Sequence, residues 1–326
     1  MFLDRETSLV RACRLSAPQP CAWLSLSALL GLQWAAAAIP AQIDLDRFDA
    51  AKTTIALPDG EKLAYVPIGD PAGKPVVLIH GYTDSARDWV PLVPYLSRQF
   101  RLILVDIRGH GRSEKPECCY TRFDFAYDIK LLLDALRVQR ADIIGHSLGS
   151  YIAQTFAELW PERTRRVVLI SSSGCPRPGS SPPRPAYDFA AQIRRLQEPI
   201  DPDSPFMIEW WSSPTPVNTD FLSRERHDAA AIPLRVWLAV LDQALEECDL
   251  QRTLPRLTAP ALLLWGGKDP IQSEQVRRTL REALPHAAVR IFPELGHNPF
   301  WEDPRACAAP INAFLEAAPA GAASPH

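Results

Sequence analysis

The sequence of 326 residues lacks any marked excess of one charge. It has 35 Lys and Arg residues against 38 Asp and Glu residues, which gives a formal net charge of −3. A nucleic-acid-binding domain carries a basic patch or stripe, so this balance predicts no nucleic-acid partner. With 47% hydrophobic residues, the chain suits one large α/β domain or two smaller ones, with enough length to bury a core.

Cysteine lacks the spacing of a metal or redox site. No Cys-x-x-Cys occurs, and two adjacent cysteines, at 118 and 119, do not have the spacing of zinc ligands. Five cysteines follow residue 38, an odd number that cannot all pair within one chain, although one or two disulfides are possible in an oxidising compartment. We expect small, buried or half-exposed thiols at Cys118, Cys119, Cys175, Cys248 and Cys307.

Glycine is scarce, with 15 residues, whereas proline is abundant, with 32. Prolines spread evenly along the chain would argue against long helices and central strands. Eleven of them instead lie between residues 176 and 233. The prolines, which interrupt helices and strands, are therefore concentrated in one stretch. They do not interrupt the strands predicted outside it.

The N-terminal segment, residues 1–38, has the pattern of an export signal. Three arginines precede an apolar stretch at 21–38 that ends in four alanines. A basic start, an apolar middle and a small-residue end are typical of a secretory signal, and they predict a periplasmic or secreted protein with no stable membrane span after processing. The alternative is an uncleaved anchor or an unstructured leader, on a membrane-anchored or cytoplasmic protein.

Short apolar, β-branched runs predict eight strands, and several are continuously apolar, as strands covered on both faces must be. The runs lie at 54–57, 63–66, 76–79, 102–105, 142–144, 167–170, 261–265 and 288–292. Apolar residues that recur every three or four positions predict helices. These helices are expected at 86–96, 125–136, 150–159, 273–284 and 304–314.

Strands that alternate with helices indicate the α/β class, with a doubly wound, mostly parallel eight-stranded sheet. The turn at 58–60, Pro-Asp-Gly, suits an antiparallel hairpin between the first two strands. The alternation breaks at 176–255, where aromatic patches predict an inserted, largely helical cap with an irregular first third. The core then comprises 39–175 and 256–317, and residues 318–326 form a flexible tail.

The predicted strand at 142–144 leads into Gly145-His146-Ser147-Leu148-Gly149, and a predicted helix follows. In a G-x-S-x-G turn the serine occupies a sharp, strained position that presents its hydroxyl above the sheet edge. Small residues two before and two after let the strand and the helix approach each other. A chance match is disfavoured because glycine is scarce and both flanking elements are present, so Ser147 is the candidate nucleophile.

A serine hydroxyl is a weak nucleophile and needs an adjacent base. Seven histidines are available. Only His297 directly follows the last predicted strand, in a turn after Gly296. A lone histidine usually has a structural role, but this position favours His297 as the base.

The acid that orients the base is expected between the serine and the histidine in the chain. Asp269 ends the turn at 266–269, directly after the penultimate strand. The strand after the nucleophile ends in three serines and offers no rival carboxylate. Glu302 and Asp303 are expected to begin the last helix, where acids suit the N-terminal dipole.

A tetrahedral oxyanion needs two backbone N–H donors. One is expected from Leu148, directly after the nucleophile. The other is expected from Tyr82, in the turn after the strand at 76–79, where Gly81 permits a tight bend. The Tyr82 side chain either lines the pocket or simply packs.

With these motifs, the sequence resembles the α/β-hydrolase fold superfamily, in its serine-nucleophile branch, over residues 54–314. The elbow at 145–149, the segments 80–85 and 106–113, and the turns 266–269 and 296–299 carry the resemblance. It implies a Ser147, Asp269 and His297 triad and an architectural role for 106–113. Relatives with an aspartate nucleophile, such as dehalogenases and epoxide hydrolases, are disfavoured, and the His-Gly-Gly-Gly run of one lipase and esterase branch is missing.

We therefore expect a serine hydrolase, resembling carboxylesterases and lactonases, that cleaves a small to medium, largely apolar ester or lactone through an acyl-enzyme. The apolar substrate is inferred from the aromatic cap, whose tryptophans are equally consistent with a core of the cap itself. No metal site or organic cofactor is implied. A small molecule is the expected binding partner.

Other interpretations remain open. Hydrolysis of a carbon–carbon bond or perhydrolysis of a carboxylic acid uses the same triad, and assays with diketone or peroxide-dependent substrates distinguish them. A ligand-binding protein that retains the fold without catalysis is disfavoured by the intact triad and oxyanion turns.

Overall fold

The structure is a computed structural model that describes residues 44–174, 188–247, 249–250 and 252–318. The predicted export segment at 1–38 lies outside these described residues, as do Cys175, Cys248, the start of the predicted cap at 176–187 and residues 319–326 of the predicted tail. Within the described residues, no helix combines the length and the apolar character that are needed to cross a bilayer.

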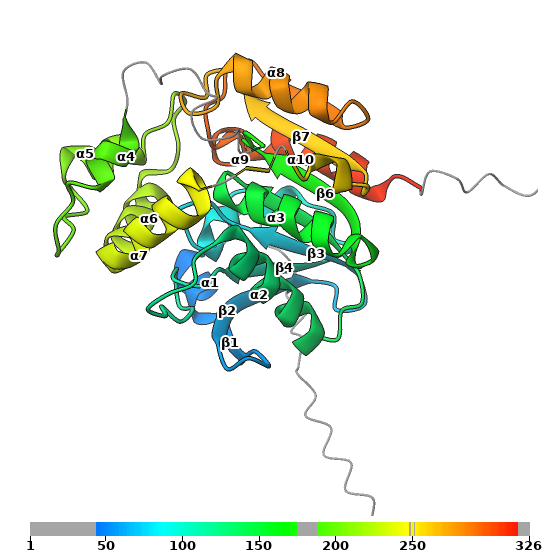
Figure 1. The fold of residues 1–326 in the computed structure, drawn as a ribbon, viewed down its shortest axis with the longest axis horizontal. Coiled ribbons are helices and arrows are strands. Elements are labelled where there is room, and N and C mark those ends of the chain that lie inside the picture. Colours follow the sequence, from blue (N-terminus) through cyan, green and yellow to red (C-terminus); the bar gives the residue numbers. More distant parts are fainter. Residues whose placement is uncertain (1–43, 175–187, 248, 251, 319–326) are drawn as a thin grey trace, which may run out of the picture. The chain divides into compact units, whose positions relative to one another are not determined.

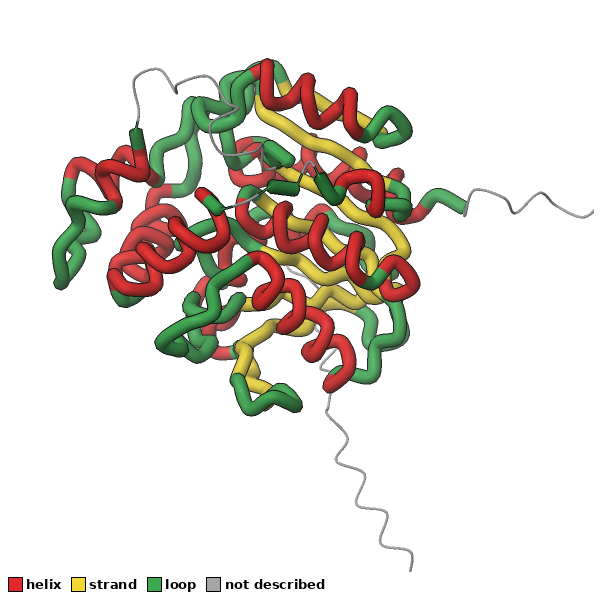
Figure 2. Tube along the Cα trace, viewed as in Figure 1, coloured by secondary structure: helices red, strands yellow, loops and turns green. Residues whose placement is uncertain are grey.

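An eight-stranded sheet forms the centre of the fold (Figure 1, Figure 2). Its strand order is β1-β2-β4-β3-β5-β6-β7-β8, and every pairing from β4 to β8 is parallel. The predicted doubly wound, mostly parallel sheet is confirmed. The strands are β1 (Thr53–Ala56), β2 (Lys62–Gly69), β3 (Lys74–Ile79), β4 (Phe100–Asp106), β5 (Ala141–His146), β6 (Thr164–Ile170), β7 (Ala261–Gly266) and β8 (Ala288–Phe292).

The central strands are apolar along their whole length because layers cover both of their faces. Every residue of β5 and of β7 is buried. The edge strands β1 and β8 are mostly exposed, which matches their more polar sequences.

The first two strands form the predicted hairpin. β1 and β2 are antiparallel, and the Gly60 N–H donates to the Leu57 carbonyl at 3.0 Å to close the turn. Gly60 has a φ of +98°, a conformation that glycine adopts without strain. β2 is also antiparallel to β4, so the hairpin forms one edge of the sheet.

Helices lie on both sides of the sheet. Figure 1 shows α2 (Arg122–Ala135) and α3 (Leu148–Leu159) in front of the strands, packed against each other, and α10 (Pro304–Glu316) behind them. The remaining core helices are α1 (Leu45–Ala50), α8 (Glu274–Ala283) and α9 (Pro299–Glu302), with the short 3₁₀ turns η3 (Pro161–Arg163) and η5 (Leu254–Arg256).

The prediction of an α-helix at 86–96 is wrong. The segment forms two 3₁₀ turns, η1 (Ala86–Trp89) and η2 (Val93–Tyr95), instead of one α-helix. Pro91 and Pro94 explain the difference, because each lacks the N–H that an α-helix uses and clashes with the preceding turn. The other four predicted helices are present, with ends that differ by up to three residues.

The described residues between β6 and β7 form the inserted helical cap, at the carboxyl ends of the parallel strands (Figure 1). Proline spacing keeps its helices short, and polar residues cap several of them; the Asn218 side chain, for example, accepts from the Phe221 N–H at 2.9 Å. The cap contains α4 (Phe189–Ile193), α5 (Pro205–Trp210), α6 (Thr219–Ala230), α7 (Leu234–Val240) and the π-helical turn η4 (Leu241–Glu246).

The expectation of free thiols is wrong for one pair of cysteines. Cys118 and Cys119 are joined by a disulfide between adjacent residues, in the loop between β4 and α2. Cys119 has a φ of +74°, and this turn of the backbone lets neighbouring side chains meet. Cys307 is a buried free cysteine, as expected.

Candidate functional site

Ser147 lies at the sharp turn where β5 ends and α3 begins. Its φ of +49° and ψ of −117° are unusual for a residue with a side chain. The Ser147 N–H donates to the Ile170 carbonyl of β6 at 2.9 Å. The strained backbone is thereby fixed to the neighbouring strand, and the serine stands at the carboxyl end of the sheet.

The glycines on either side of Ser147 are required by close backbone contacts. A Cβ at Gly145 would lie 2.1 Å from the Gly149 carbonyl oxygen, and a Cβ at Gly149 would lie 2.1 Å from the Ile79 carbonyl oxygen. Backbone atoms at such distances cannot give way as a flexible side chain can. The predicted reason for the G-x-S-x-G spacing is therefore visible in the contacts of the turn.

Asp269 and His297 are in direct contact. His297 Nδ1 lies 2.8 Å from Asp269 Oδ2, while Asp269 Oδ1 accepts from the N–H groups of Ile271 and Gln272 at 2.7 and 2.9 Å. Burial of Asp269 opposes ionisation, but the attraction of His297 and these hydrogen bonds hold the pKa of the carboxyl below its usual value. Asp269 is therefore an ionised carboxylate that can accept a hydrogen bond from His297 Nδ1.

The backbone of His297 is anchored beside the nucleophile turn. Its carbonyl accepts from Ser171 Oγ at 2.6 Å and from His146 Nε2 at 3.1 Å. Because His146 precedes Ser147 and Ser171 follows Ile170, these bonds join the histidine loop to the ends of β5 and β6. The structure shows no hydrogen bond between the Ser147 hydroxyl and the His297 imidazole; in a ligand-free site such contacts are often longer than in the reacting complex.

The two predicted oxyanion donors lie on turns next to Ser147. Leu148 is the first residue of α3, where backbone N–H groups have no partner within the helix. Tyr82 follows β3 and is buried. A Cβ at Gly81 would lie 2.9 Å from His146 Nδ1, so the Tyr82 turn passes directly over the residue that precedes the nucleophile.

Comparisons with known proteins show the family to which the chain belongs. The family model described as the alpha/beta hydrolase fold matches residues 74–208 and 209–304. The chain belongs to the α/β-hydrolase fold family. At the level of this family, its activity is that of a hydrolase.

Three relatives illustrate the range of the family. The chain is 30% identical over 243 residues, 73% of its length, to the dihydrolipoyllysine-residue acetyltransferase component of the acetoin cleaving system of Pseudomonas putida, and it spans 62% of that relative. It is 29% identical to the 2-hydroxy-6-oxononadienedioate/2-hydroxy-6-oxononatrienedioate hydrolase of Paraburkholderia phymatum, over 71% of this chain and 83% of that one. A hydrolase from Pseudomonas aeruginosa PA01 has a TM-score of 0.70 and 27% identity, over 82% of this chain and 98% of that structure.

Aromatic side chains of this α/β hydrolase join the cap to the predicted oxyanion turn. The Tyr82 hydroxyl donates to the Trp237 carbonyl at 2.7 Å, and its ring lies edge-on to the rings of Trp210 and Trp237. Trp210 Nε1 donates to Thr83 Oγ1 at 3.0 Å. The Tyr82 side chain thus packs against the cap, and these tryptophans contact the catalytic domain as well as their own helices.

A second contact joins the cap to the histidine loop. Trp211 of the cap stacks on Trp301, with ring centroids 5.5 Å apart. Glu302 does not begin the last helix as expected: it ends α9, and its carboxylate accepts from the Gly296 N–H at 2.8 Å. Asp303 does begin α10, where its side chain accepts from the Ala306 N–H.

The loop after β4 is consistent with an architectural role. The buried Asp106 carboxylate accepts from Lys52 Nζ at 2.9 Å, from the Ala86 N–H at 2.6 Å and from the Arg112 N–H at 2.8 Å. Burial opposes ionisation of Asp106, but Lys52 and these N–H groups leave its pKa below the usual value. The loop thereby ties the edge of the hydrolase sheet to η1.

Sequence reasoning did not single out a buried polar group beneath the predicted oxyanion turn. Asp84, Asp88 and Glu225 are all buried, and so is His146. Asp84 belongs to the segment 80–85 that carried the family resemblance. That membership was the only sequence signal that pointed to the buried group. Glu225 comes from the cap, so no local pattern links it to the other three.

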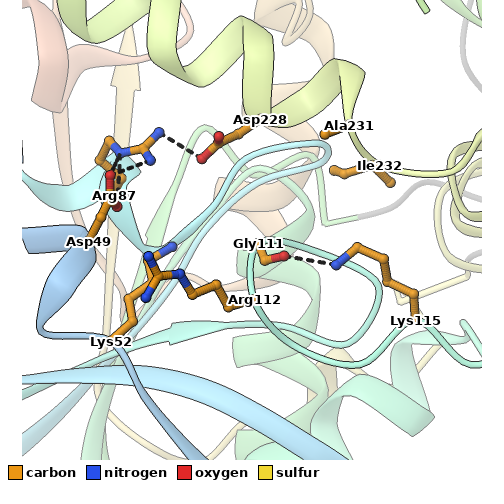
Figure 3. Close-up of a pocket in the computed structure, with 9 residues that line it drawn as sticks. All are labelled: Asp49, Lys52, Arg87, Gly111, Arg112, Lys115, Asp228, Ala231 and Ile232. Atoms are coloured by element: carbon orange, nitrogen blue, oxygen red, sulfur yellow. Dashed lines mark hydrogen bonds and ion pairs between the residues drawn. The ribbon is translucent and has the colours of Figure 1, made fainter. Parts of the chain in front are cut away.

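A pocket of about 240 Å³ lies where cap helix α6 meets the hydrolase core (Figure 3). Arg87 lies between Asp49 of α1 and Asp228 of α6, with nitrogen–oxygen distances of 2.6 and 2.7 Å. The pocket lining contains none of the candidate catalytic residues. This cluster therefore holds the cap to the core at a place separate from the triad. The lining consists of Asp49, Lys52, Arg87, Gly111, Arg112, Lys115, Asp228, Ala231 and Ile232.

Proposed function

We propose that this α/β hydrolase is a serine hydrolase that cleaves a carboxylic ester or lactone of a small to medium, largely apolar substrate. The observation that carries the proposal is the Asp269–His297 contact of 2.8 Å beside the strained turn of Ser147. A nucleophile, a base and an orienting acid in this chain order are the parts of a serine hydrolase.

In the proposed reaction, Ser147 Oγ attacks the carbonyl carbon while His297 Nε2 takes the hydroxyl proton. The tetrahedral oxyanion accepts hydrogen bonds from the backbone N–H groups of Leu148 and Tyr82. His297 then returns the proton to the leaving alcohol oxygen, and the acyl group stays on Ser147. A water molecule gives a proton to His297 and attacks the acyl carbon. His297 then returns this proton to Ser147 Oγ as the acyl–oxygen bond breaks, which releases the acid and the free serine.

Asp269 makes this cycle possible by fixing the imidazole tautomer. Its carboxylate accepts the Nδ1 proton of His297, so Nε2 carries the lone pair that faces the nucleophile. The same carboxylate stabilises the imidazolium that forms after each proton transfer. The two backbone N–H groups on Oδ1 keep it in place throughout.

The aromatic contacts of the cap support an apolar substrate. Trp210 and Trp237 lie against the ring of Tyr82, whose backbone is the proposed oxyanion donor. Apolar walls with a few polar groups are typical of small-molecule sites. We therefore infer a small apolar ester or lactone as the partner.

A second candidate reaction is hydrolysis of a carbon–carbon bond next to a ketone, by the same triad. Similarity to the Paraburkholderia phymatum hydrolase, whose name gives a hydroxy-oxo dienedioate as substrate, favours this candidate. A dicarboxylate is far more polar than the aromatic surroundings of Tyr82, so the ester or lactone remains the first choice.

The decisive experiment compares wild type and Ser147→Ala on p-nitrophenyl esters and lactones of graded size, together with a diketone. We expect turnover of an ester or lactone by wild type, no turnover by Ser147→Ala, and unchanged circular dichroism. Ser273→Ala, which removes a serine at the N-terminus of α8, is the matched control and should keep full activity.

Unchanged turnover by Ser147→Ala would overturn the mechanism. Turnover of the diketone alone would favour carbon–carbon bond hydrolysis. Labelling of Ser147 by a serine-directed phosphonate, without turnover of any substrate, would favour a ligand-binding protein.

A further inference from the structure

Three buried side chains converge beneath the predicted oxyanion turn. Asp84 follows that turn, Asp88 lies on η1, and His146 ends β5 directly before Ser147. One ligand atom from each lies within 4.8 Å of the others, and His146 Nδ1 is 3.8 Å from a carboxylate oxygen of each aspartate. These separations are too long for hydrogen bonds.

The hydrogen bond of His146 determines which of its two ring nitrogens is free to act as an acceptor toward the aspartates. His146 Nε2 lies 3.1 Å from the His297 carbonyl oxygen, which only accepts, so Nε2 carries a proton. In that tautomer Nδ1 carries a lone pair, and it has no hydrogen-bond partner among the described residues.

The Asp88 carboxylate adds two further acceptors without a donor. Its side chain is fully buried, and neither oxygen has a hydrogen-bond partner among the described residues. Trp301 Nε1 donates to the Asp88 backbone carbonyl at 3.1 Å.

No basic side chain among the described residues is shown paired with Asp88. The nearest arginine in the chain, Arg87, directs its guanidinium to Asp49, Glu225 and Asp228 instead. Two buried carboxylates and an imidazole lone pair therefore face one another without a counter-charge. Buried carboxylates are stable only when they are neutralised, by a proton or by a bound cation.

We propose that Asp84, Asp88 and His146 bind one divalent first-row transition-metal ion, with Zn²⁺ the first expectation. Zn²⁺ accepts neutral imidazole nitrogen and carboxylate oxygen at bond lengths of about 2.0–2.2 Å. In tetrahedral geometry these bond lengths separate the ligand atoms by about 3.3–3.6 Å. The three ligand atoms, which lie 3.8 Å apart between Nδ1 and each carboxylate and within 4.8 Å overall, therefore draw closer around the ion. The imidazole ligand disfavours Mg²⁺ and Ca²⁺, which prefer oxygen alone.

The role of this ion is structural, and the inference does not depend on which bond the enzyme cleaves. The ion would join the turn that carries Tyr82 to the strand end that carries Ser147. His146 also donates to the His297 carbonyl, so the same ligand set orients the histidine loop. Metal-binding histidines commonly donate their second N–H to a carbonyl in this way.

The test measures metal content in the full chain, produced without a histidine tag from media supplemented with Zn²⁺, Mn²⁺ or Co²⁺. By elemental mass spectrometry we expect about one equivalent of metal in wild type and below about 0.1 equivalent in Asp88→Asn and Asp84→Asn. Asp142→Asn is the matched control, because Asp142 is a buried carboxylate of β5 that pairs with Arg165 at 3.5 Å. This variant should keep the metal.

A second measurement covers the case in which the aspartate variants do not fold. Removal of the metal from wild type by a chelator should lower Tm by about 5–10 °C, and addition of Zn²⁺ alone should restore it. The proposal would be overturned if wild type contained no metal from any medium and had the same Tm before and after chelation. A proton shared by the buried carboxylates would then neutralise the cluster. Retention of the metal by folded Asp84→Asn and Asp88→Asn variants would overturn it as well.

Discussion

Asp269 uses both of its carboxylate oxygens, and their different partners define what the residue contributes. Oδ1 is occupied by two backbone N–H groups, so only Oδ2 is available to the His297 Nδ1 proton. An asparagine at 269 would keep a similar shape. Its N–H₂ group would replace one of the two carboxylate oxygens, so it would face either the His297 Nδ1 proton or the two backbone N–H donors.

At the residue scale we therefore predict that Asp269→Asn lowers kcat by about 10³–10⁴-fold. The loss follows because an amide N–H₂ facing Nδ1 favours the tautomer in which Nε2 carries the proton and cannot act as a base. Steady-state kinetics on the best ester of the panel provide the measurement.

Asp303→Asn is the control for that variant, because Asn replaces Asp at the N-cap of α10 with little cost. Its kcat should match that of wild type. A loss below tenfold in Asp269→Asn would show that this carboxylate does not orient the base.

At the scale of elements, one of the contacts between the cap and the catalytic domain runs through Tyr82. The Tyr82 hydroxyl donates to the Trp237 carbonyl of α7, while the Tyr82 backbone belongs to the predicted oxyanion turn. A movement of α7 is therefore transmitted to the turn through a single buried hydrogen bond.

We predict that Tyr82→Phe raises KM several-fold and lowers the free energy of unfolding by about 1 kcal/mol. The variant removes the hydroxyl donor from the Trp237 carbonyl, which keeps the Leu241 N–H, and loosens the cap above the site. Tyr120→Phe is the matched control, since the Tyr120 hydroxyl donates to the Pro116 carbonyl at the same 2.7 Å away from the triad. Both variants should lose similar stability, measured by denaturant unfolding, but only Tyr82→Phe should change KM; equal kinetic effects would contradict this role for the cap.

At the scale of the whole molecule, buried ionisable groups make stability depend on pH in both directions. Burial lowers the pKa of His80 to about 3 and that of His110 to about 4, so the unfolded chain binds more protons than the fold below pH 6.5 and stability falls with acid. Glu225 acts in the opposite sense. Burial, opposed in part by Arg87, raises its pKa to about 8.

Because Glu225 is protonated in the fold and ionised in the unfolded chain between pH 4.5 and 8, its contribution to stability is complete below pH 4.5 and is lost as pH rises to 8. We predict that Glu225→Gln removes this loss, so that stability relative to wild type increases with pH across that window. Urea unfolding at several pH values provides the measurement. Glu209→Gln, on the exposed face of α5, is the control and should follow wild type; parallel curves for wild type and Glu225→Gln would contradict the prediction.

Local pattern predicted the sheet well, because a strand buried on both faces must be apolar throughout. Seven of the eight predicted runs lie within strands, and the eighth, 54–57, extends one residue beyond β1. The order of strands and helices along the chain was enough to indicate the parallel, doubly wound arrangement. At 86–96 the apolar spacing predicted an α-helix, but the segment contains two prolines. Because proline lacks the backbone N–H that an α-helix needs, the segment forms two 3₁₀ turns instead. The disulfide between Cys118 and Cys119 was missed because it depends on a backbone turn that composition does not reveal.

The sequence by itself determined the fold class and the turns on which Ser147, Asp269 and His297 lie, because turn chemistry and strand order are local properties. Only the tertiary structure decided which side chains meet. The Asp269–His297 contact, the attachment of Tyr82 to the cap, and the cluster of Asp84, Asp88 and His146 each join segments far apart in the chain. Such contacts depend on how layers pack and on how buried charges are neutralised, and neither can be read from spacing along one chain.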